Sequence, residues 1–122
     1  MSGRNDMAWR LVLALAGVIG ATGVMAAAAA SHGGESRNLG AVATICLAHG
    51  PALLALALAG RGRVLGVAAG LLAIGTLVFV GDLGLREWRG QGLFSGAAPL
   101  GGAGMIGGWL AIVVAALVRR RQ

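Results

Sequence analysis

Four apolar runs, each about twenty residues long, make up most of this 122-residue chain. They cover residues 11–30, 39–59, 64–85 and 99–118. A helix rises about 1.5 Å per residue, so about 20 apolar residues are enough to cross a hydrocarbon core about 30 Å thick. The pattern therefore predicts an all-α polytopic membrane protein, a four-transmembrane-helix bundle that forms a single domain over residues 1–122.

The composition supports a lipid environment and argues against other partners. Hydrophobic residues make up 57% of the chain and charged residues only 11%. A water-soluble domain of this length could not bury so much apolar surface, so the lipid bilayer is the first expected partner. The formal charge of +6 comes from arginines at the ends of the apolar runs, a pattern that sets membrane topology. We therefore expect no nucleic-acid partner.

The arginines are distributed unequally between the two sets of helix ends. Seven lie at the chain termini and in the break after the second run, namely Arg4, Arg10, Arg61, Arg63, Arg119, Arg120 and Arg121. Three lie at the opposite ends, namely Arg37, Arg86 and Arg89. Because positively charged ends stay in the cytoplasm, both termini are expected to be cytoplasmic. The use of arginine alone among basic residues, with much alanine and glycine, is typical of bacterial proteins from GC-rich genomes, which indicates the bacterial inner membrane.

The first run also resembles a secretory signal, because Arg10 precedes an apolar stretch that ends in AAAAAS. Its apolar core of about twenty residues exceeds the 7–15 residues typical of a signal. We therefore expect this run to remain as a membrane helix.

His49 is the strongest candidate for a functional residue. It is close to the middle of the second run, and ionisable groups at the bilayer midplane are rare and often functional. Pro51 lacks an amide hydrogen, so the carbonyl of Leu47 loses its helical partner and a kink is expected. His49 could carry protons, bind a metal or haem iron, or donate one hydrogen bond that holds the bundle together. Packing is the favoured interpretation, and the functional ones stay open.

Two other ionisable residues belong to the candidate set. His32 is at the outer end of the first run, far from the depth of His49, so a haem held by both histidines is not expected. Only Glu35 could join His32 as a ligand, so no metal site is predicted. Asp82 interrupts the third run, but Arg86 follows four residues later on the same helical face. That spacing predicts a structural ion pair.

Other residues predict how the helices pack and which covalent sites are excluded. Pairs of small residues four apart occur in three runs, at Gly17 with Ala21, Gly66 with Gly70, and Gly104 with Gly108. Such faces let helix backbones approach closely in lipid, either within the chain, which we favour, or against a partner. Trp109, among glycines in the last run, is expected to fill a packing groove. Cys46 is the only cysteine, so no intramolecular disulfide or thiolate cluster is possible.

The connection over residues 86–98 mixes charges with Trp88, Leu93 and Phe94. This composition predicts a segment in the headgroup region, and whether it re-enters the bilayer stays open.

Three motifs resemble a known family. They are CLAHGPALLAL from Cys46, GTLVFVGDL from Gly75 and APLGGAGMIGGWLAIVVAAL from Ala98. Together they are similar to the family of small bacterial membrane proteins called domain of unknown function 423, akin to the transmembrane protein 256 family of mitochondria. In that family a small polar residue usually stands at the position of Asp82. The resemblance implies four transmembrane helices, but it implies no established activity, ligand or catalytic residue.

Two classes of function follow from these observations. The first, which we favour, is a non-catalytic accessory or structural subunit that packs beside a larger membrane complex, respiratory or photosynthetic, or that self-associates. The alternative is a small transporter or channel, in which His49 and the free carbonyl of Leu47 line a path. Neither interpretation predicts an enzyme, a cofactor or a bound metal.

Overall fold

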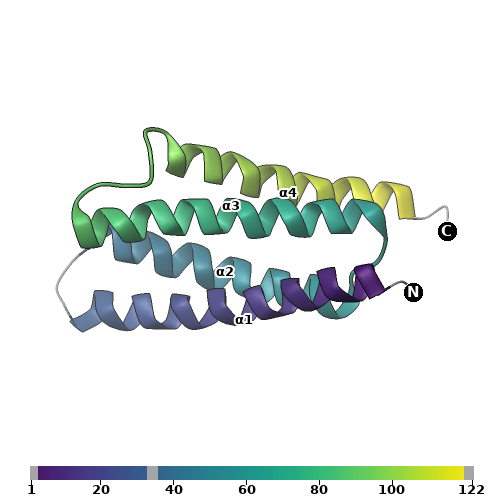
Figure 1. Cartoon of the computed structure of the whole chain (residues 1–122), viewed down its shortest axis with the longest axis horizontal. Coiled ribbons are helices and arrows are strands. Elements are labelled where there is room, and N and C mark those ends of the chain that lie inside the picture. The colour runs from purple at the N-terminus through teal and green to yellow at the C-terminus, as the bar shows by residue number, and fades with distance from the viewer. Residues whose placement is uncertain (1–2, 33–35, 120–122) are drawn as a thin grey trace.

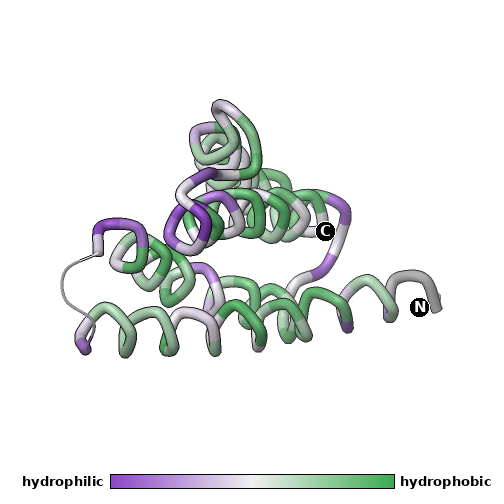
Figure 2. Tube along the Cα trace, turned by 60° about the vertical axis from the view of Figure 1, so that its left-hand side comes forward, coloured by the Kyte–Doolittle hydropathy of each residue, from purple (hydrophilic) through white to green (hydrophobic). Residues whose placement is uncertain are grey.

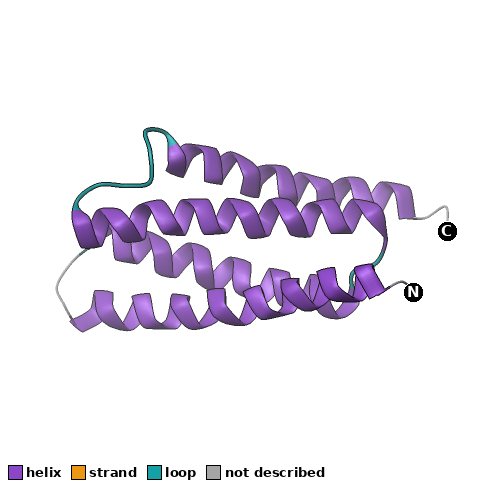
Figure 3. Cartoon of the chain, viewed as in Figure 1, coloured by secondary structure: helices purple, strands orange, loops and turns teal. Residues whose placement is uncertain are grey.

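The computed structural model describes residues 3–32 and 36–119, and it places almost all of them in four helices. These are α1 (Gly3–His32), α2 (Arg37–Ala59), α3 (Gly62–Arg89) and α4 (Ala97–Arg119), as Figures 1 and 3 show. Each helix is long and apolar enough to cross a membrane. The structure confirms the predicted all-α class with four helices able to span a membrane, so the chain has the character of a multi-pass membrane protein.

The helices extend beyond the apolar runs that predicted them. The first begins at Gly3, before the run at residue 11, and the third continues to Arg89, past the end of its run at residue 85. Hydropathy marks the stretch that suits lipid, whereas helical hydrogen bonding continues into the polar ends. The third helix stops at Gly90, whose φ of 79° is left-handed and whose amide donates to the carbonyl of Arg86 at 2.9 Å. Glycine adopts this conformation without a steric penalty.

The two ends of the molecule differ in what they contain. The start of α1, the end of α4 and the α2–α3 connection lie at one end, and the end of α1, the start of α2 and the α3–α4 connection lie at the other (Figure 1). Figure 2 shows that hydrophilic residues gather at these ends and that the helix bodies are mainly apolar. This arrangement is the one that an up-and-down membrane protein requires.

The helices pack in chain order and the array stays open. The first hairpin pairs α1 with α2, the second pairs α3 with α4, and α2 joins the hairpins by packing on α3. Within the described residues, the backbone of α4 approaches neither α1 nor α2. The outer helix α4 therefore packs along α3, and α1 packs along α2 with only a brief approach to α3, so many large apolar side chains of α1 and α4 remain exposed.

Glycines allow the two helices of each hairpin to pack closely. A Cβ added at Gly75 would lie 2.7 Å from the carbonyl oxygen of Gly101, and one added at Gly101 would lie 2.7 Å from that of Gly75. In the other hairpin, a Cβ at Gly50 would lie 3.0 Å from the amide nitrogen of Gly20. Helices gain van der Waals contact and weak C–H hydrogen bonds at such distances, and these replace the hydrophobic force that lipid removes.

The predicted packing glycines divide into two groups. A Cβ at Gly104 would lie 3.4 Å from Gly75 Cα, and one at Gly108 would lie 2.7 Å from Leu72 Cγ, so both residues face α3 as expected. An added Cβ at Gly66 or Gly70 would meet no atom within 4 Å. The expectation that these two glycines pack within the chain is therefore wrong, because they lie outside the surfaces that α3 presents to α2 and α4. The open position of Gly17 is the same kind of case.

Candidate functional site

His49 lies on α2 and is buried, with 6% of its surface exposed. Its Nδ1 is 2.9 Å from the carbonyl oxygen of Ile45, one turn earlier on the same helix. Its Nε2 accepts a hydrogen bond from Nε1 of Trp109 on α4, at 3.0 Å. The two rings meet edge to face, with centroids 5.7 Å apart and planes at 70°. The side chains of α2 and α4 therefore meet, although the two backbones do not.

These two bonds fix the hydrogen on the imidazole. The indole N–H can only donate, so Nε2 of His49 must present a lone pair. The carbonyl of Ile45 can only accept, so Nδ1 must carry the hydrogen. The ring is then the neutral Nδ1–H tautomer, with one nitrogen donating and the other accepting.

This arrangement leaves the imidazole little capacity for other chemistry. A metal or haem iron would need the lone pair that Trp109 occupies, and a proton added at Nε2 would break the same bond. Among the residues that the structure describes, no group of three His, Cys, Asp or Glu side chains is placed to hold a metal ion. His49 forms an interhelical hydrogen bond, as the packing interpretation expected, but it accepts this bond from Trp109 instead of donating it.

A shallow apolar groove lies beside the His49–Trp109 pair. It has a volume of about 260 Å³ and opens onto the surface of the helix array. Its walls come from α2, α3 and α4 and consist of Ile45, His49, Phe79, Gly102, Met105, Ile106 and Trp109. Trp109 is 43% exposed, so it closes one side of this groove rather than filling an enclosed core. The groove offers a surface for a hydrocarbon chain, and His49 contributes its only ionisable side chain.

The three residues of the motif His49-Gly50-Pro51 differ in what they contact. His49 reaches α4, and Gly50 provides the close backbone approach to α1 described above. Pro51 is exposed on the outside of α2, and the helix continues through it. The motif therefore marks the level at which α2 contacts α1 through its backbone and α4 through a side chain.

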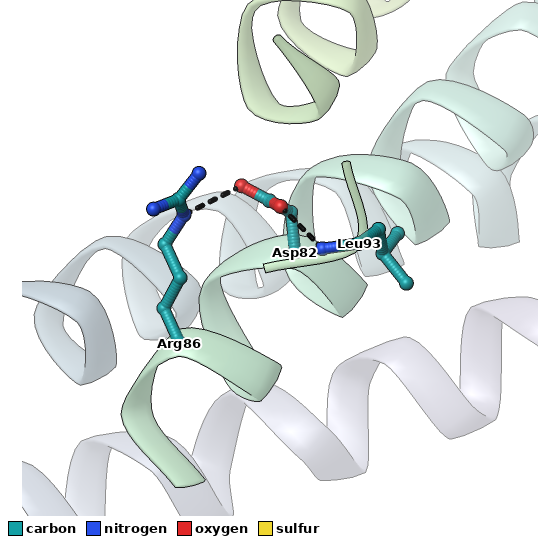
Figure 4. Close-up of polar contacts among 3 residues, drawn as sticks. All are labelled: Asp82, Arg86 and Leu93. Atoms are coloured by element: carbon teal, nitrogen blue, oxygen red, sulfur yellow. Dashed lines mark hydrogen bonds and ion pairs between the residues drawn. The ribbon is translucent and has the colours of Figure 1, made fainter. Parts of the chain in front are cut away.

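Asp82 forms the second polar cluster and is fully buried near the far end of α3. Its Oδ2 accepts a hydrogen bond from Nε of Arg86 at 3.0 Å, the ion pair that the spacing predicted. Its Oδ1 accepts a hydrogen bond from the backbone amide of Leu93 at 2.8 Å (Figure 4). A charge-assisted bond to each oxygen compensates for the removal of the carboxylate from water.

The hydrogen bond from the Leu93 amide to Asp82 fixes the path of the connection between α3 and α4. Residues 86–89 are the last turn of α3, and the chain from Gly90 onward folds back so that Leu93 reaches Asp82. Gly92 lies so close that an added Cβ would collide with Oδ1 of Asp82. The sequence alone did not predict the contacts of Asp82 with Gly92 and Leu93, because no local spacing links Asp82 to residues 92 and 93.

The remaining candidates lie apart from these clusters. His32 is exposed at the last residue of α1, and Glu35 falls outside the described residues. At the same end of the molecule, Ser36 donates a hydrogen bond to Oε1 of Glu87 at 2.7 Å and links the start of α2 to the end of α3. The structure therefore brings His49 together with Trp109, and Asp82 with Arg86, and joins neither pair to His32.

Thr76 is a buried polar residue that the sequence analysis passed over. It is fully buried on α3, and its hydroxyl has no hydrogen-bond partner among the described residues. A threonine in the middle of an apolar run was the available signal. In helices this hydroxyl can donate to a carbonyl one turn back, which makes it easy to read as a neutral packing residue.

Comparison with known families gives one match. The model of a protein of unknown function, DUF423, matches residues 16–102, which is more than half of the chain. The chain belongs to the DUF423 family. No curated protein and no solved structure matches the chain significantly. The resemblance to this family is thus confirmed, and the match covers the first two motifs whole and the beginning of the third.

The DUF423 match includes one polar cluster whole and divides the other. Asp82, Arg86 and Leu93 all lie within residues 16–102. His49 also lies within them, whereas its partner Trp109 lies beyond the matched segment. Membership of the DUF423 family assigns no chemistry to either cluster, so the functional argument depends on the geometry.

Proposed function

We propose that this DUF423 protein is a non-catalytic accessory or structural protein of the membrane, which packs beside a larger membrane complex. The observation that carries the proposal is the open helix array. The backbone of α4 approaches only α3 and that of α1 approaches mainly α2, so both outer helices keep a long apolar face unpaired within the described chain. An open array of this kind can accept further helices at its edges, which a closed bundle cannot.

The polar residues inside the array support a structural role over transport. A transport site must release its hydrogen bonds to a moving ion or solute. Here Trp109 and Ile45 occupy both ring nitrogens of His49, and Arg86 and Leu93 occupy both carboxylate oxygens of Asp82. The groove beside His49 has otherwise apolar walls, so it offers no polar path to either surface.

The proposal includes a location and an orientation. The arginine excess at the end that holds both termini favours that end as the cytoplasmic one, in the inner membrane of a bacterium. The larger complex is of respiratory or photosynthetic type, since such complexes gather small single-domain membrane subunits. A self-associated form is the other arrangement that two unpaired edges allow.

Site-specific photocrosslinking in the native membrane tests the proposal. The crosslinking amino acid is placed at Leu110, which is 60% exposed on the outer helix α4, and at Ile74, which is 65% exposed on the inner helix α3. A stoichiometric protein partner captured from Leu110 and not from Ile74, and recovered again by mild native purification, would support an edge-packing subunit.

Two results would count against this role. If both positions capture only lipid and the protein purifies alone, the accessory role fails. If the purified protein in liposomes carries a proton or solute flux that His49→Phe abolishes, the transporter alternative is correct. The same crosslinking amino acid placed at Val18, which is 59% exposed on the other outer helix α1, shows which of the two outer helices contacts the partner.

A further inference from the structure

A larger hollow lies at the end of the molecule that holds both termini, away from the polar clusters. It has a volume of about 570 Å³ and lies between the beginning of α1 and the beginning of α3. Its walls are Ala8, Trp9, Gly62, Arg63, Gly66 and Val67. A neighbouring hollow of about 370 Å³ includes Trp9, Arg10 and Arg61. Trp9 is common to both hollows, and its ring is 2.9 Å from where a Cβ of Gly60 would lie, so it is packed against the α2–α3 connection.

The rim of these hollows is positively charged. Arg10, Arg61 and Arg63 are exposed, and none of them forms an ion pair with another described residue. The one acid that lines either hollow is Asp6, which lies in the smaller hollow with Arg10 and Arg61. The larger hollow therefore has Arg63 as its only charged wall residue. Three arginines and one acid leave an excess of positive charge at this end.

The backbone at the start of α3 adds to this field. Arg61 occupies the N-cap position of a 28-residue helix, and no side chain caps the first amides. Gly62 follows with φ of 86°, a conformation that other residues rarely adopt, so the chain turns sharply into the helix beside Arg63. Uncapped amides at a helix start carry partial positive charge and favour an anion.

Apart from Arg63, the side chains that line the larger hollow are mainly apolar, namely those of Ala8, Trp9 and Val67. Gly66 lies one turn deeper along α3 than Arg63, and Gly70 lies one further turn toward the middle of the helix. Neither glycine would meet another atom within 4 Å if it carried a Cβ. Both glycines were expected to pack against another helix and do not. Gly66 lines the larger hollow with Arg63, and Gly70 continues the same open part of α3 one turn beyond it.

We propose that this hollow binds one anionic glycerophospholipid. Its phosphate group lies at Arg63 and the start of α3, with Arg10 and Arg61 nearby, and an acyl chain leaves the hollow along the open part of α3 over Gly66 and Gly70. A charged rim that leads into an apolar floor matches the two halves of a phospholipid, and basic pockets between membrane helices bind such headgroups. A free phosphate ion has no apolar part to contact the apolar side chains, and an apolar partner helix has no negative charge to pair with the arginines. The lipid site is independent of the accessory role and stands whether or not a partner complex is found.

Native mass spectrometry of the full-length protein in a mild neutral detergent tests the site. The probes are phosphatidylglycerol and phosphatidylcholine with the same acyl chains, titrated separately, and inorganic phosphate as competitor. Phosphatidylglycerol should be retained at lower concentration than phosphatidylcholine, and millimolar phosphate should not displace it. Arg63→Gln should weaken phosphatidylglycerol binding about fivefold, the effect of one basic residue near an anionic headgroup.

Matched variants at the other end of α3 separate the site from general charge and fold. Arg89→Gln removes an arginine far from the hollow, and Gly84→Leu adds a side chain at another glycine with open space around it. Neither should change phosphatidylglycerol binding. Gly66→Leu should weaken the binding of both lipids, because its side chain fills part of the hollow without changing the charge. Circular dichroism confirms that each variant is folded.

Four outcomes would overturn the proposal. They are equal binding of the two lipids, displacement by inorganic phosphate, equal losses for Arg63→Gln and Arg89→Gln, and unchanged lipid binding in a folded Gly66→Leu variant.

Discussion

The two buried polar clusters of this protein solve the same problem in different ways. His49 is 6% exposed and Asp82 is fully buried, and each has its hydrogen-bonding atoms filled by protein groups. Asp82 uses partners 4 and 11 residues away, whereas His49 uses Ile45, 4 residues away, and Trp109, 60 residues away. The first cluster is charged and local, and the second is neutral and long-range.

The difference teaches what each cluster can hold together. The Asp82 cluster lies within the α3–α4 hairpin, so it can form when that hairpin forms, and it fixes the loop that leads into α4. The His49–Trp109 bond needs α2 and α4 to be in place on the two sides of α3. It therefore fixes how the two hairpins sit relative to each other. Substitutions that break one cluster should leave the function of the other intact.

The largest effect is expected from Arg86→Ala. This change leaves a fully buried carboxylate with the Leu93 amide as its only remaining partner, and breaking a buried pair in this way is strongly destabilising. The unfolding equilibrium, measured by denaturation with sodium dodecyl sulfate in mixed micelles, should shift toward the unfolded state by roughly a hundredfold.

Asp82→Ala should cost less than Arg86→Ala, because the side chain of Arg86 is 44% exposed and can reach water once it is alone. Its main cost is the unpaired amide of Leu93, roughly a tenfold shift. Arg89→Ala, an arginine near the end of the same helix, is the control and should be nearly neutral. If Asp82→Ala proves the more damaging change, the buried charge is not the reason for the pair.

Gly92→Ala should have the next largest effect. Its Cβ would collide with Oδ1 of Asp82, which is fully buried and held from two sides, so the loop has to move. The bond from Leu93 then weakens, and the shift should be roughly tenfold, comparable to the loss of that hydrogen bond. Hydrogen exchange at the Leu93 amide measures this directly, and it should speed up in Gly92→Ala. An unchanged exchange rate would mean that the hydrogen bond from Leu93 to Asp82 tolerates the added Cβ at residue 92.

The contrast between the clusters also shows what the sequence could predict. The Asp82–Arg86 pair follows from i,i+4 spacing, which holds on any helix, and the four spans follow from hydropathy and length. The partner of His49 could not be predicted, because the spacing of residues within one helix does not determine which face of another helix packs against that residue. The same reason explains the glycines. Gly104 and Gly108 face α3 while Gly66 and Gly70 face no helix, although both pairs have the same spacing.

Trp109→Phe should have a smaller effect than the changes around Asp82. The variant keeps an aromatic ring but removes the indole N–H, which leaves Nε2 of His49 without its donor. Interhelical hydrogen bonds in membranes contribute about 1 kcal/mol or less, so stability should fall by about that amount.

A double-mutant cycle isolates this bond. His49→Phe and Trp109→Phe are measured alone and together, and the coupling between them should be about 1 kcal/mol. The coupling of either change with Arg86→Ala should be near zero, because the two clusters share no residue. A coupling between the clusters as large as the one within the His49–Trp109 pair would show that the local and long-range contacts are one network.

The smallest expected effect is a change of tautomer at His49, and it tests the hydrogen positions on which the neutral assignment of this ring depends. Because indole only donates and a carbonyl only accepts, the ring must carry its hydrogen on Nδ1. Nitrogen NMR of selectively labelled histidine distinguishes a protonated from a bare ring nitrogen, and His32, exposed at the end of α1, provides an internal reference. His49 should give one protonated signal, Nδ1, and Trp109→Phe should allow the other tautomer to appear. If the wild-type ring already carries its hydrogen on Nε2, Trp109 cannot be donating to it, and the link between the two hairpins must be made by packing alone.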